Sequence, residues 1–172
     1  RFGSFTIAWE RREDPTVVQI FLSKPGAPSE ERAKRRYPGS DESSDSSIDE
    51  LIRDLKQYLE GRDVRFSLDY LAMERCSPFQ QAILRAEHDI PRGYVSTYGR
   101  IAARLGRPGG ARAAGRALAT NPFPVVIPCH RAVRSDGALG GYQGGVDMKR
   151  ALLSMEGVEF DGDKVKMNRV YY

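Results

Sequence analysis

The pattern of this sequence changes near residue 75, and that change limits the folds the chain can adopt. Residues 5–9 and 16–22 are runs of β-branched and aromatic residues, separated by a charged turn. Such runs favour an antiparallel pair of strands. Beyond residue 75, apolar residues recur at helical spacing instead. Because 172 residues suffice for two small domains, we expect a mixed α/β (α+β) fold with domains at 1–74 and 75–172.

The N-terminal part is expected to form a compact αβ unit. Residues 24–47 are rich in proline, glycine, serine and charged residues, which predicts a long flexible loop. Apolar residues then recur at helical spacing over 48–59, with Ser47 as the N-cap and Glu50 three residues later. Residues 64–70 alternate between polar and apolar and predict a strand. None of these elements carries recognisable chemistry.

The C-terminal part has the outline of a helix-turn-helix. A helix is expected to begin at Ser77-Pro78 and to end before Pro91-Arg92-Gly93. Two further helical segments, separated by a turn rich in glycine and proline, place the helix-turn-helix at about 97–120. The last segment carries Arg112 and Arg116 at helical spacing among small residues. Such a surface can approach a nucleic-acid backbone closely, or it can merely pack tightly against neighbouring helices.

The net charge of +4 hides an asymmetry between the two parts. Residues 1–74 carry 12 basic and 15 acidic side chains, whereas residues 75–172 carry 15 basic and 8 acidic ones. The basic part suits a polyanion such as nucleic acid, although scattered arginines often form only a solvated face. The apolar stretches are too short to cross a bilayer, so no membrane association is expected. The N-terminal residues lack the pattern of a secretion signal, which favours an intracellular location.

The two cysteines, Cys76 and Cys129, lie far apart in the sequence. Neither has a second cysteine or a histidine at metal-ligand spacing, apart from His130 directly after Cys129, and we therefore predict no metal site. Free thiols are expected in an intracellular protein, with a Cys76–Cys129 disulfide as the alternative.

Cys129 follows an apolar run bracketed by prolines and precedes two basic residues, His130 and Arg131. A free thiol has a pKa of about 8.5, and nearby cations or hydrogen-bond donors lower it. Adjacent side chains point apart on a strand. His130 would therefore contact the sulfur through a turn at Pro128 or through a bridging water, and we favour the water.

A histidine that acts as a base usually has a carboxylate on its other ring nitrogen, and Glu156 is the candidate here. Asp147 can cap the last helix and Gly157 can end it, which places Glu156 at the negative end of the helix dipole. A carboxylate is disfavoured there unless another group holds it. A solvated surface glutamate is the alternative interpretation.

The motif Ile127-Pro128-Cys129-His130-Arg131, with Asn121-Pro122 before it and Gly140-Gly141-Tyr142-Gln143-Gly144-Gly145 after it, resembles the O6-alkylguanine-DNA alkyltransferase family. These proteins are also called methylated-DNA–protein-cysteine methyltransferases. The resemblance extends from Ser77 to Gly157. It implies a ribonuclease-H-like N-terminal domain and a C-terminal winged helix-turn-helix domain that carries both DNA binding and catalysis.

The resemblance also implies roles for individual residues. Cys129 accepts the alkyl group, and His130, a water and Glu156 form the relay that removes the thiol proton. Tyr98 donates a proton to the leaving guanine, and Arg112 enters the base stack while the damaged base rotates out. Further implied contacts to substrate or DNA are those of Asn121, which ties the recognition helix to the cysteine turn, of Ala132, Tyr142 and Gln143 around the guanine, and of the small residues Ala111, Ala113 and Gly115.

By the same resemblance, the partner is double-stranded DNA containing O6-alkylguanine, bound through its minor groove, with O4-alkylthymine as a further candidate. The transfer happens once, is irreversible and needs no cofactor. We expect a monomer that is cytoplasmic and associated with the nucleoid, or nuclear in a eukaryote. Two departures leave the range of alkyl groups open: Ala132 stands where the family usually has valine, and Gln143 replaces a smaller residue. No cysteine precedes Cys76, so the structural zinc of some relatives has no ligand set here.

Three other functions are compatible with parts of the pattern. A thiol hydrolase could use Cys129, His130 and Glu156, but it would turn over repeatedly and would not need the basic helix-turn-helix. A winged-helix regulator could hold Cys129 as a structural residue. A non-enzymatic alkyltransferase-like protein binds the same damage, but such relatives replace the acceptor cysteine that this chain retains.

Overall fold

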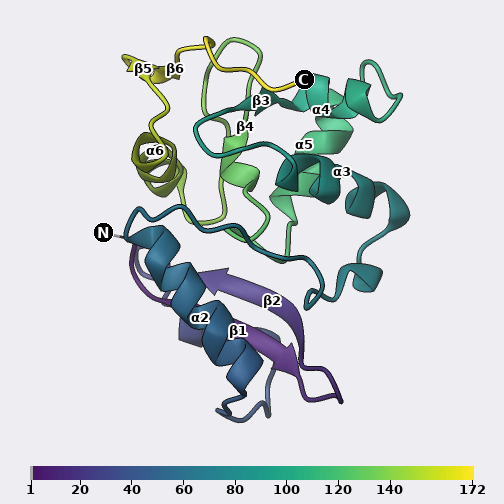
Figure 1. Ribbon diagram of the computed structural model, residues 1–172, viewed down its shortest axis with the longest axis vertical. Coiled ribbons are helices and arrows are strands. Elements are labelled where there is room, and N and C mark those ends of the chain that lie inside the picture. The colour runs from purple at the N-terminus through teal and green to yellow at the C-terminus, as the bar shows by residue number, and fades with distance from the viewer. Residues whose placement is uncertain (1) are drawn as a thin grey trace. The chain divides into compact units, whose positions relative to one another are not determined.

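The computed structural model describes residues 2–172 and divides the chain into two compact units (Figure 1). Unit 1 extends to Met73 and also includes Pro122–Val126, whereas unit 2 contains Glu74–Asn121 and Ile127–Tyr172. The division after Met73 lies close to the expected domain boundary. The return of residues 122–126 to unit 1 was not expected, because a pattern read along the chain gives no sign of it.

Unit 1 contains the expected antiparallel pair of strands. β1 (Phe5–Glu10) pairs with β2 (Thr16–Leu22), and the register shifts between Ala8 and Trp9. The buried side chains of β2 are apolar: Val17, Val18, Ile20, Phe21 and Leu22. The backbone N–H of Ile20 donates to the carbonyl of Pro122 (2.8 Å), which attaches the returning segment to this strand.

The prediction of a flexible loop over residues 24–47 is wrong in part, because α1 (Ser29–Arg36) lies within it. The high content of charged residues suggested disorder, but the sequence in which acidic and basic residues follow one another suits a helix. Glu30 and Glu31 occupy the first turn, and three basic residues occupy the last, as the helix dipole favours. Ser29 and Ala33 are buried, and α1 contacts both β1 and β2. Packing of this small face therefore stabilises a segment whose composition alone favours disorder.

α2 (Ser46–Leu59) is the amphipathic helix predicted over 48–59, with Ile48, Leu51, Leu55 and Tyr58 buried. Its N-cap is Asp45 rather than Ser47: the Asp45 side chain accepts a hydrogen bond from the Ser47 backbone N–H (2.9 Å). The two residues are interchangeable as caps on chemical grounds.

The strand predicted over 64–70 is absent. Only Leu71 pairs, in an isolated parallel bridge with Val17. Phe66 is buried and packs edge-on against Tyr58, with ring centroids 5.6 Å apart. The alternation of polar and apolar residues in this segment therefore reflects which side chains are buried. The segment has no neighbouring strand to pair with, so it does not form a strand.

Unit 2 begins with three helices that contact one another: α3 (Pro78–His88), α4 (Tyr98–Arg104) and α5 (Ala111–Ala119). Ser77 caps α3, where a helix was expected to begin, and Thr97 caps α4, through hydrogen bonds of 3.3 and 3.2 Å to backbone N–H groups three residues on. A Cβ added at Gly110 would lie 3.1 Å from the Cβ of Ala102. Small residues at this turn therefore let α4 and α5 pack closely.

The rest of unit 2 consists of short elements around the last helix. β3 (Ser96–Thr97) pairs in parallel with β4 (Ala132–Val133), and β5 (Phe160–Asp161) pairs with β6 (Lys164–Val165) in antiparallel. α6 (Val146–Met155) and two 3-10 turns, η1 (Met73–Arg75) and η2 (Cys129–Arg131), complete the elements. Buried apolar residues from these segments form one core cluster: Val95, Val133, Leu139, Leu153, Val158 and Val165. The β3–β4 pair brings the residues that follow η2 beside those that precede α4.

Candidate active site

Cys129 lies in a tight turn that begins after Pro128, where a turn was one of the two alternatives that the sequence left open, and not in extended backbone. The Cys129 N–H donates to the carbonyl of Ile127 (2.8 Å), and the Arg131 N–H donates to that of Pro128 (2.7 Å). Successive side chains of a 3-10 turn diverge by about a third of a turn instead of pointing to opposite sides. The turn thus lets three consecutive residues contribute to one buried region. Cys129 is 6% exposed and His130 is 0% exposed.

The Cys129 side chain is a neutral thiol in this environment. Burial raises its pKa to about 12, while a hydrogen bond to the Asn121 side chain and the Lys149 charge act in the opposite direction. Asn121 also donates from Nδ2 to the carbonyl of Ile127 (3.0 Å), beside the turn. Sequence reasoning expected partners that lower the thiol pKa. It could not foresee that burial outweighs them, because depth is a property of the folded chain.

The His130 ring contacts Glu156, with 3.0 Å between Nε2 and Oε1, and both side chains are fully buried. Burial raises the pKa of the Glu156 carboxyl, but His130 and Arg131 together hold it well below its usual range. Burial, together with the charges of Arg131 and Lys149, lowers the pKa of His130, although Glu156 acts to raise it. At neutral pH the pair is therefore an ionised carboxylate and a neutral imidazole. The proton lies on Nε2, toward the carboxylate, which leaves Nδ1 as the basic nitrogen.

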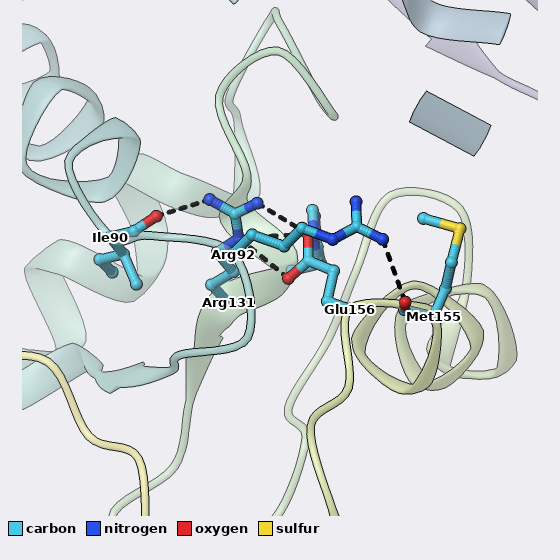
Figure 2. A network of polar contacts seen from close by, with 6 residues as sticks. Ile90, Arg92, Arg131, Met155 and Glu156 are labelled. Carbon is cyan, nitrogen blue, oxygen red and sulfur yellow. Dashed lines mark hydrogen bonds and ion pairs between the residues drawn. The ribbon is translucent and has the colours of Figure 1, made fainter. Parts of the chain in front are cut away.

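Arg131 holds the carboxylate from a second side (Figure 2). Its Nε donates to Glu156 Oε2 (3.0 Å) and its Nη2 donates to Oε1 (2.7 Å), which is a bidentate contact. Its Nη1 donates to the carbonyl of Ile90 (2.5 Å). Arg92 donates to the carbonyl of Met155 (3.1 Å), at the end of α6. Cationic groups thus offset the negative end of the helix dipole where Glu156 lies, as its position in the sequence required.

Tyr98 is the first residue of α4, and the loop that follows β4 passes close to it. A Cβ added at Gly140 would lie 2.8 Å from the Tyr98 hydroxyl oxygen, and Gly140 has a φ of +69°. Glycine is therefore needed there for both space and backbone conformation. Burial raises the pKa of Tyr98 to about 12, so the phenol stays protonated and can donate.

The other residues of the 140–145 loop contact the same region. The Tyr142 ring lies edge-on to the His130 ring, with centroids 6.1 Å apart. The Gln143 side chain donates to the backbone carbonyl of Asn121. Ala132 is fully buried in β4. The structure thus brings Cys129, His130, Glu156, Tyr98, Asn121, Ala132, Tyr142 and Gln143 into one unit.

The face of α5 has two parts. Arg112 and Arg116 are exposed, while Ala111, Ala113 and Gly115 are half-buried. A Cβ added at Gly115 would lie 3.8 Å from the Tyr98 ring, so this glycine borders the tyrosine. The absence of a side chain at Gly115 therefore lets α5 pack against Tyr98. The other small residues leave little side-chain bulk around the exposed arginines.

Two buried charged residues of the site escaped sequence reasoning. Lys149 is 0% exposed and donates from Nζ to the carbonyls of Ala132 (2.6 Å) and Leu139 (2.5 Å). Glu87 is also 0% exposed. Each lies at helical spacing from buried leucines or isoleucines on its own helix. A charged residue on an apolar helical stripe was the signal that could have revealed them.

The described residues also limit other kinds of site. Cys76 and Cys129 are both free and buried, so they form no disulfide. Within residues 2–172, no group of three or more histidine, cysteine, aspartate or glutamate side chains could hold a metal ion. No helix in that range combines the length and the apolar character needed to cross a membrane.

Comparison with known proteins shows the family of this chain. Residues 78–158 match the family described as 6-O-methylguanine DNA methyltransferase, DNA binding domain. The methylated-DNA–protein-cysteine methyltransferase of Methanothermobacter thermautotrophicus is 46% identical over 123 residues, which are 72% of this chain and 69% of that protein. This chain belongs to the methylated-DNA–protein-cysteine methyltransferase family. The resemblance drawn from the cysteine motif is confirmed.

Solved structures of methyltransferases agree with the mixed α/β fold. The O6-methylguanine-DNA methyltransferase of Pyrococcus kodakaraensis aligns with a TM-score of 0.66 at 28% identity, over 90% of this chain and 100% of that one. OGT of Mycobacterium tuberculosis in complex with DNA aligns with a TM-score of 0.62 at 28% identity, over 87% of this chain and 85% of that one.

Proposed function

We propose that this chain repairs DNA by direct reversal, in one irreversible turnover that moves an alkyl group from O6 of guanine to Cys129. The observation that carries the proposal is the buried turn in which Cys129 is followed by His130, whose ring contacts Glu156 at 3.0 Å, in a chain of the methyltransferase family. A nucleophile, a neutral base and an orienting carboxylate are the groups that activation of a thiol requires.

The reaction exchanges one alkyl group for one proton. The bond between sulfur and the alkyl carbon forms as the bond between that carbon and O6 breaks, and guanine leaves with the electron pair. The thiol proton passes to His130, by way of a water, and Tyr98 supplies the proton that guanine takes. His130 then releases its proton to solvent and Tyr98 takes one back, so one proton in all moves from sulfur to guanine. No electron is gained or lost overall, so we expect no cofactor. The thioether that forms has no leaving group comparable to guanine, so the protein is consumed.

Burial of Cys129 fits a nucleophile that is used once. A thiol with a pKa of about 12 is almost entirely protonated at neutral pH and is protected from oxidation and chance alkylation. The thiolate then forms only when the relay through neutral His130 accepts the proton in the presence of the alkylated base. His130 in turn becomes a cation beside ionised Glu156, which stabilises it.

The exposed arginines and small residues of α5 support the proposed binding to DNA. We propose that unit 2 is a winged helix-turn-helix domain, that unit 1 is ribonuclease-H-like, and that α5 lies in the minor groove of double-stranded DNA containing O6-alkylguanine. The exposed Arg112 would fill the space left by the rotated base, and the small residues Ala111, Ala113 and Gly115 would permit close approach of the backbone. Rotation of a base costs a few kcal/mol, and less for a base whose pairing is already weakened.

The remaining site residues are assigned supporting roles. Asn121 ties the end of the recognition helix to the cysteine turn through its 3.0 Å bond to Ile127. Ala132 and Gln143 contact the guanine through backbone atoms, and Tyr142 forms a wall of the base pocket. We further propose that the protein acts as a monomer, in the cytoplasm or, in a eukaryote, in the nucleus.

Intact mass spectrometry tests the function directly. The protein is incubated with a duplex oligonucleotide that contains one O6-methylguanine, and separately with the same duplex containing guanine. We expect one methyl group on the Cys129 peptide, at no more than one per protein molecule, and only with the damaged duplex. A thiol hydrolase would release product repeatedly and leave no lasting adduct. Absence of the adduct, or its presence on Cys76, would refute the proposal.

Replacing Arg112 with alanine tests the role of α5. We expect affinity for the damaged duplex to fall by about 1–3 kcal/mol, because a contact that fills the base stack is lost. The rate of transfer from a single strand bearing the same base should change less, since no stack needs filling there. Fluorescence anisotropy and single-turnover kinetics measure the two effects. Arg65→Ala, which removes one exposed arginine of unit 1, is the control for the loss of charge. Equal effects of the two substitutions would contradict the role of Arg112.

A further inference from the structure

The site contains a buried carboxyl group that the chemistry above does not use. Glu87 lies on α3, which contacts the η2 turn that carries Cys129. Its side chain is 0% exposed, and neither carboxylate oxygen has a hydrogen-bond partner of acceptable geometry. Burying an ionised carboxylate without such partners is costly, whereas the protonated acid is tolerated more easily. The surroundings of Glu87 therefore favour its neutral form.

Lys149 is the buried cation of the same region. Its Nζ donates to the backbone carbonyls of Ala132 (2.6 Å), Leu139 (2.5 Å) and Gly141 (3.5 Å). An ammonium group has three N–H donors and a neutral amine has only two, so three carbonyl acceptors favour the charged form. The same Nζ lies 5.9 Å from the centroid of the Tyr98 ring. Burial acts against this and lowers the pKa of Lys149 to about 8, so at neutral pH Lys149 is a cation near both the acceptor thiol and the proton donor.

The groups that act on Glu87 come from α6 and η2 and from the residue that directly follows each of them. Burial raises the pKa of Glu87 to about 8, Lys149 of α6 and Arg131 of η2 act to lower it, the Ala132 N–H lowers it slightly, and Glu156 raises it. Arg131 already forms a bidentate contact with Glu156, so Lys149 is the cation still available to Glu87. An ionised Glu87 would in turn disfavour negative charge on Cys129, Tyr98 and Tyr172, because it raises the pKa of each of these groups.

The Cys129 thiolate and an ionised Glu87 therefore compete for one counter-ion. Lys149 stabilises negative charge on Cys129, and Cys129 and Glu87 both stabilise the Lys149 cation. When Glu87 is neutral, the positive charge of Lys149 stabilises the thiolate first and then the negative charge on Tyr98 as it gives up its proton. With Glu87 ionised, a buried carboxylate opposes both steps, and such repulsion is strong because the region has a low dielectric.

We propose that Glu87 is a positioning residue whose neutral form keeps Lys149 available to Cys129, and that ionisation of Glu87 slows alkyl transfer. The proposal rests on the function proposed above. Glu87 touches neither the substrate nor the reacting atoms, and it acts through the charge balance at Cys129 and Tyr98. Alkaline conditions then promote formation of the thiolate, but they also ionise the carboxyl group that opposes it and remove the proton of Lys149, whose pKa is lowered to about 8.

The substitution Glu87→Gln tests this role, because an amide keeps the size and neutrality of the acid and cannot ionise. Single-turnover transfer from the damaged duplex is measured in the full chain across the range from about pH 7 to about pH 9.5. The ratio of the Glu87→Gln rate to the wild-type rate is expected to rise about tenfold over this range. Glu159→Gln, which removes an exposed carboxylate, is the matched control and should show a constant ratio.

A constant or falling ratio for Glu87→Gln would overturn the proposal, since a purely structural role changes rate without changing its dependence on pH. If the variant fails to fold, carbon-13 NMR of the wild-type Glu87 carboxyl gives the same decision. Titration near pH 8 supports the proposal, and titration near the usual value of about 4.3 overturns it. Absence of any adduct on wild-type Cys129 would refute the function itself, which separates the two failures.

Discussion

Replacement of Cys129 with serine is expected to abolish the alkyl adduct while leaving affinity for DNA nearly unchanged. A serine hydroxyl is a far weaker acid than a thiol, so neutral His130 cannot generate its anion. The hydroxyl is smaller than the thiol and can still pair with the Asn121 side chain, so the turn should remain intact. Intact mass spectrometry and fluorescence anisotropy with the same damaged duplex measure the two properties.

Cys76→Ser is the matched control, because it makes the same chemical change at the other buried, free cysteine. It should keep the full adduct. An adduct on the Cys129→Ser protein would place the acceptor elsewhere. Loss of DNA binding in that variant, with folding intact by circular dichroism, would contradict the separation between the acceptor and the DNA-binding surface of α5.

The parts of the fold that the sequence predicted well are those set by neighbouring residues. Ser77 and Thr97 begin α3 and α4 through bonds to N–H groups three residues away, which short sequence patterns record directly. The β1–β2 pair is likewise joined by a short turn. In contrast, the segment 64–70 alternates like a strand and has no strand to pair with. An alternating sequence indicates which side chains are buried, but it does not show whether another strand is available to pair with the segment.

The sequence predicted which residues form the site, but it did not predict the direction in which burial shifts the pKa of Cys129. The choice of Glu156 as the partner of His130 came from a helix end that disfavours a carboxylate, and the 3.0 Å contact supplies the missing reason. Burial of Cys129, by contrast, raises the pKa of the thiol, where the basic neighbours suggested that it would be lowered. Lys149 and Glu87 were missed, although each lies at helical spacing from apolar residues on its own helix. Only packing of α3 and α6 around the turn makes them buried charges.

Glu156→Gln is expected to reduce both transfer and stability. The amide keeps the shape of the side chain but removes the charge that orients His130 and stabilises its cation. Loss of a positioned acid–base partner reduces such rates by about 10²–10⁴-fold. Arg131 would also lose its buried counter-ion, which costs about 3–5 kcal/mol of unfolding free energy when one member of such a pair is removed. Single-turnover kinetics and urea unfolding at neutral pH measure the two losses, with exposed Glu159→Gln as the control.

The same variant should change how stability depends on acid. His130 and Arg131 hold the pKa of Glu156 below its unfolded-state value of about 4.3, although burial acts to raise it. The unfolded chain therefore binds the proton first, so the stabilisation from ionised Glu156 is complete above about pH 5 and declines as the pH falls toward the folded-state pKa. Glutamine cannot titrate, so the gap in unfolding free energy between wild type and Glu156→Gln should narrow between about pH 5 and about pH 3. A gap that stays constant over that range would mean that the charge of Glu156 does not stabilise the fold, and the assignment of Arg131 as its partner would fail with it.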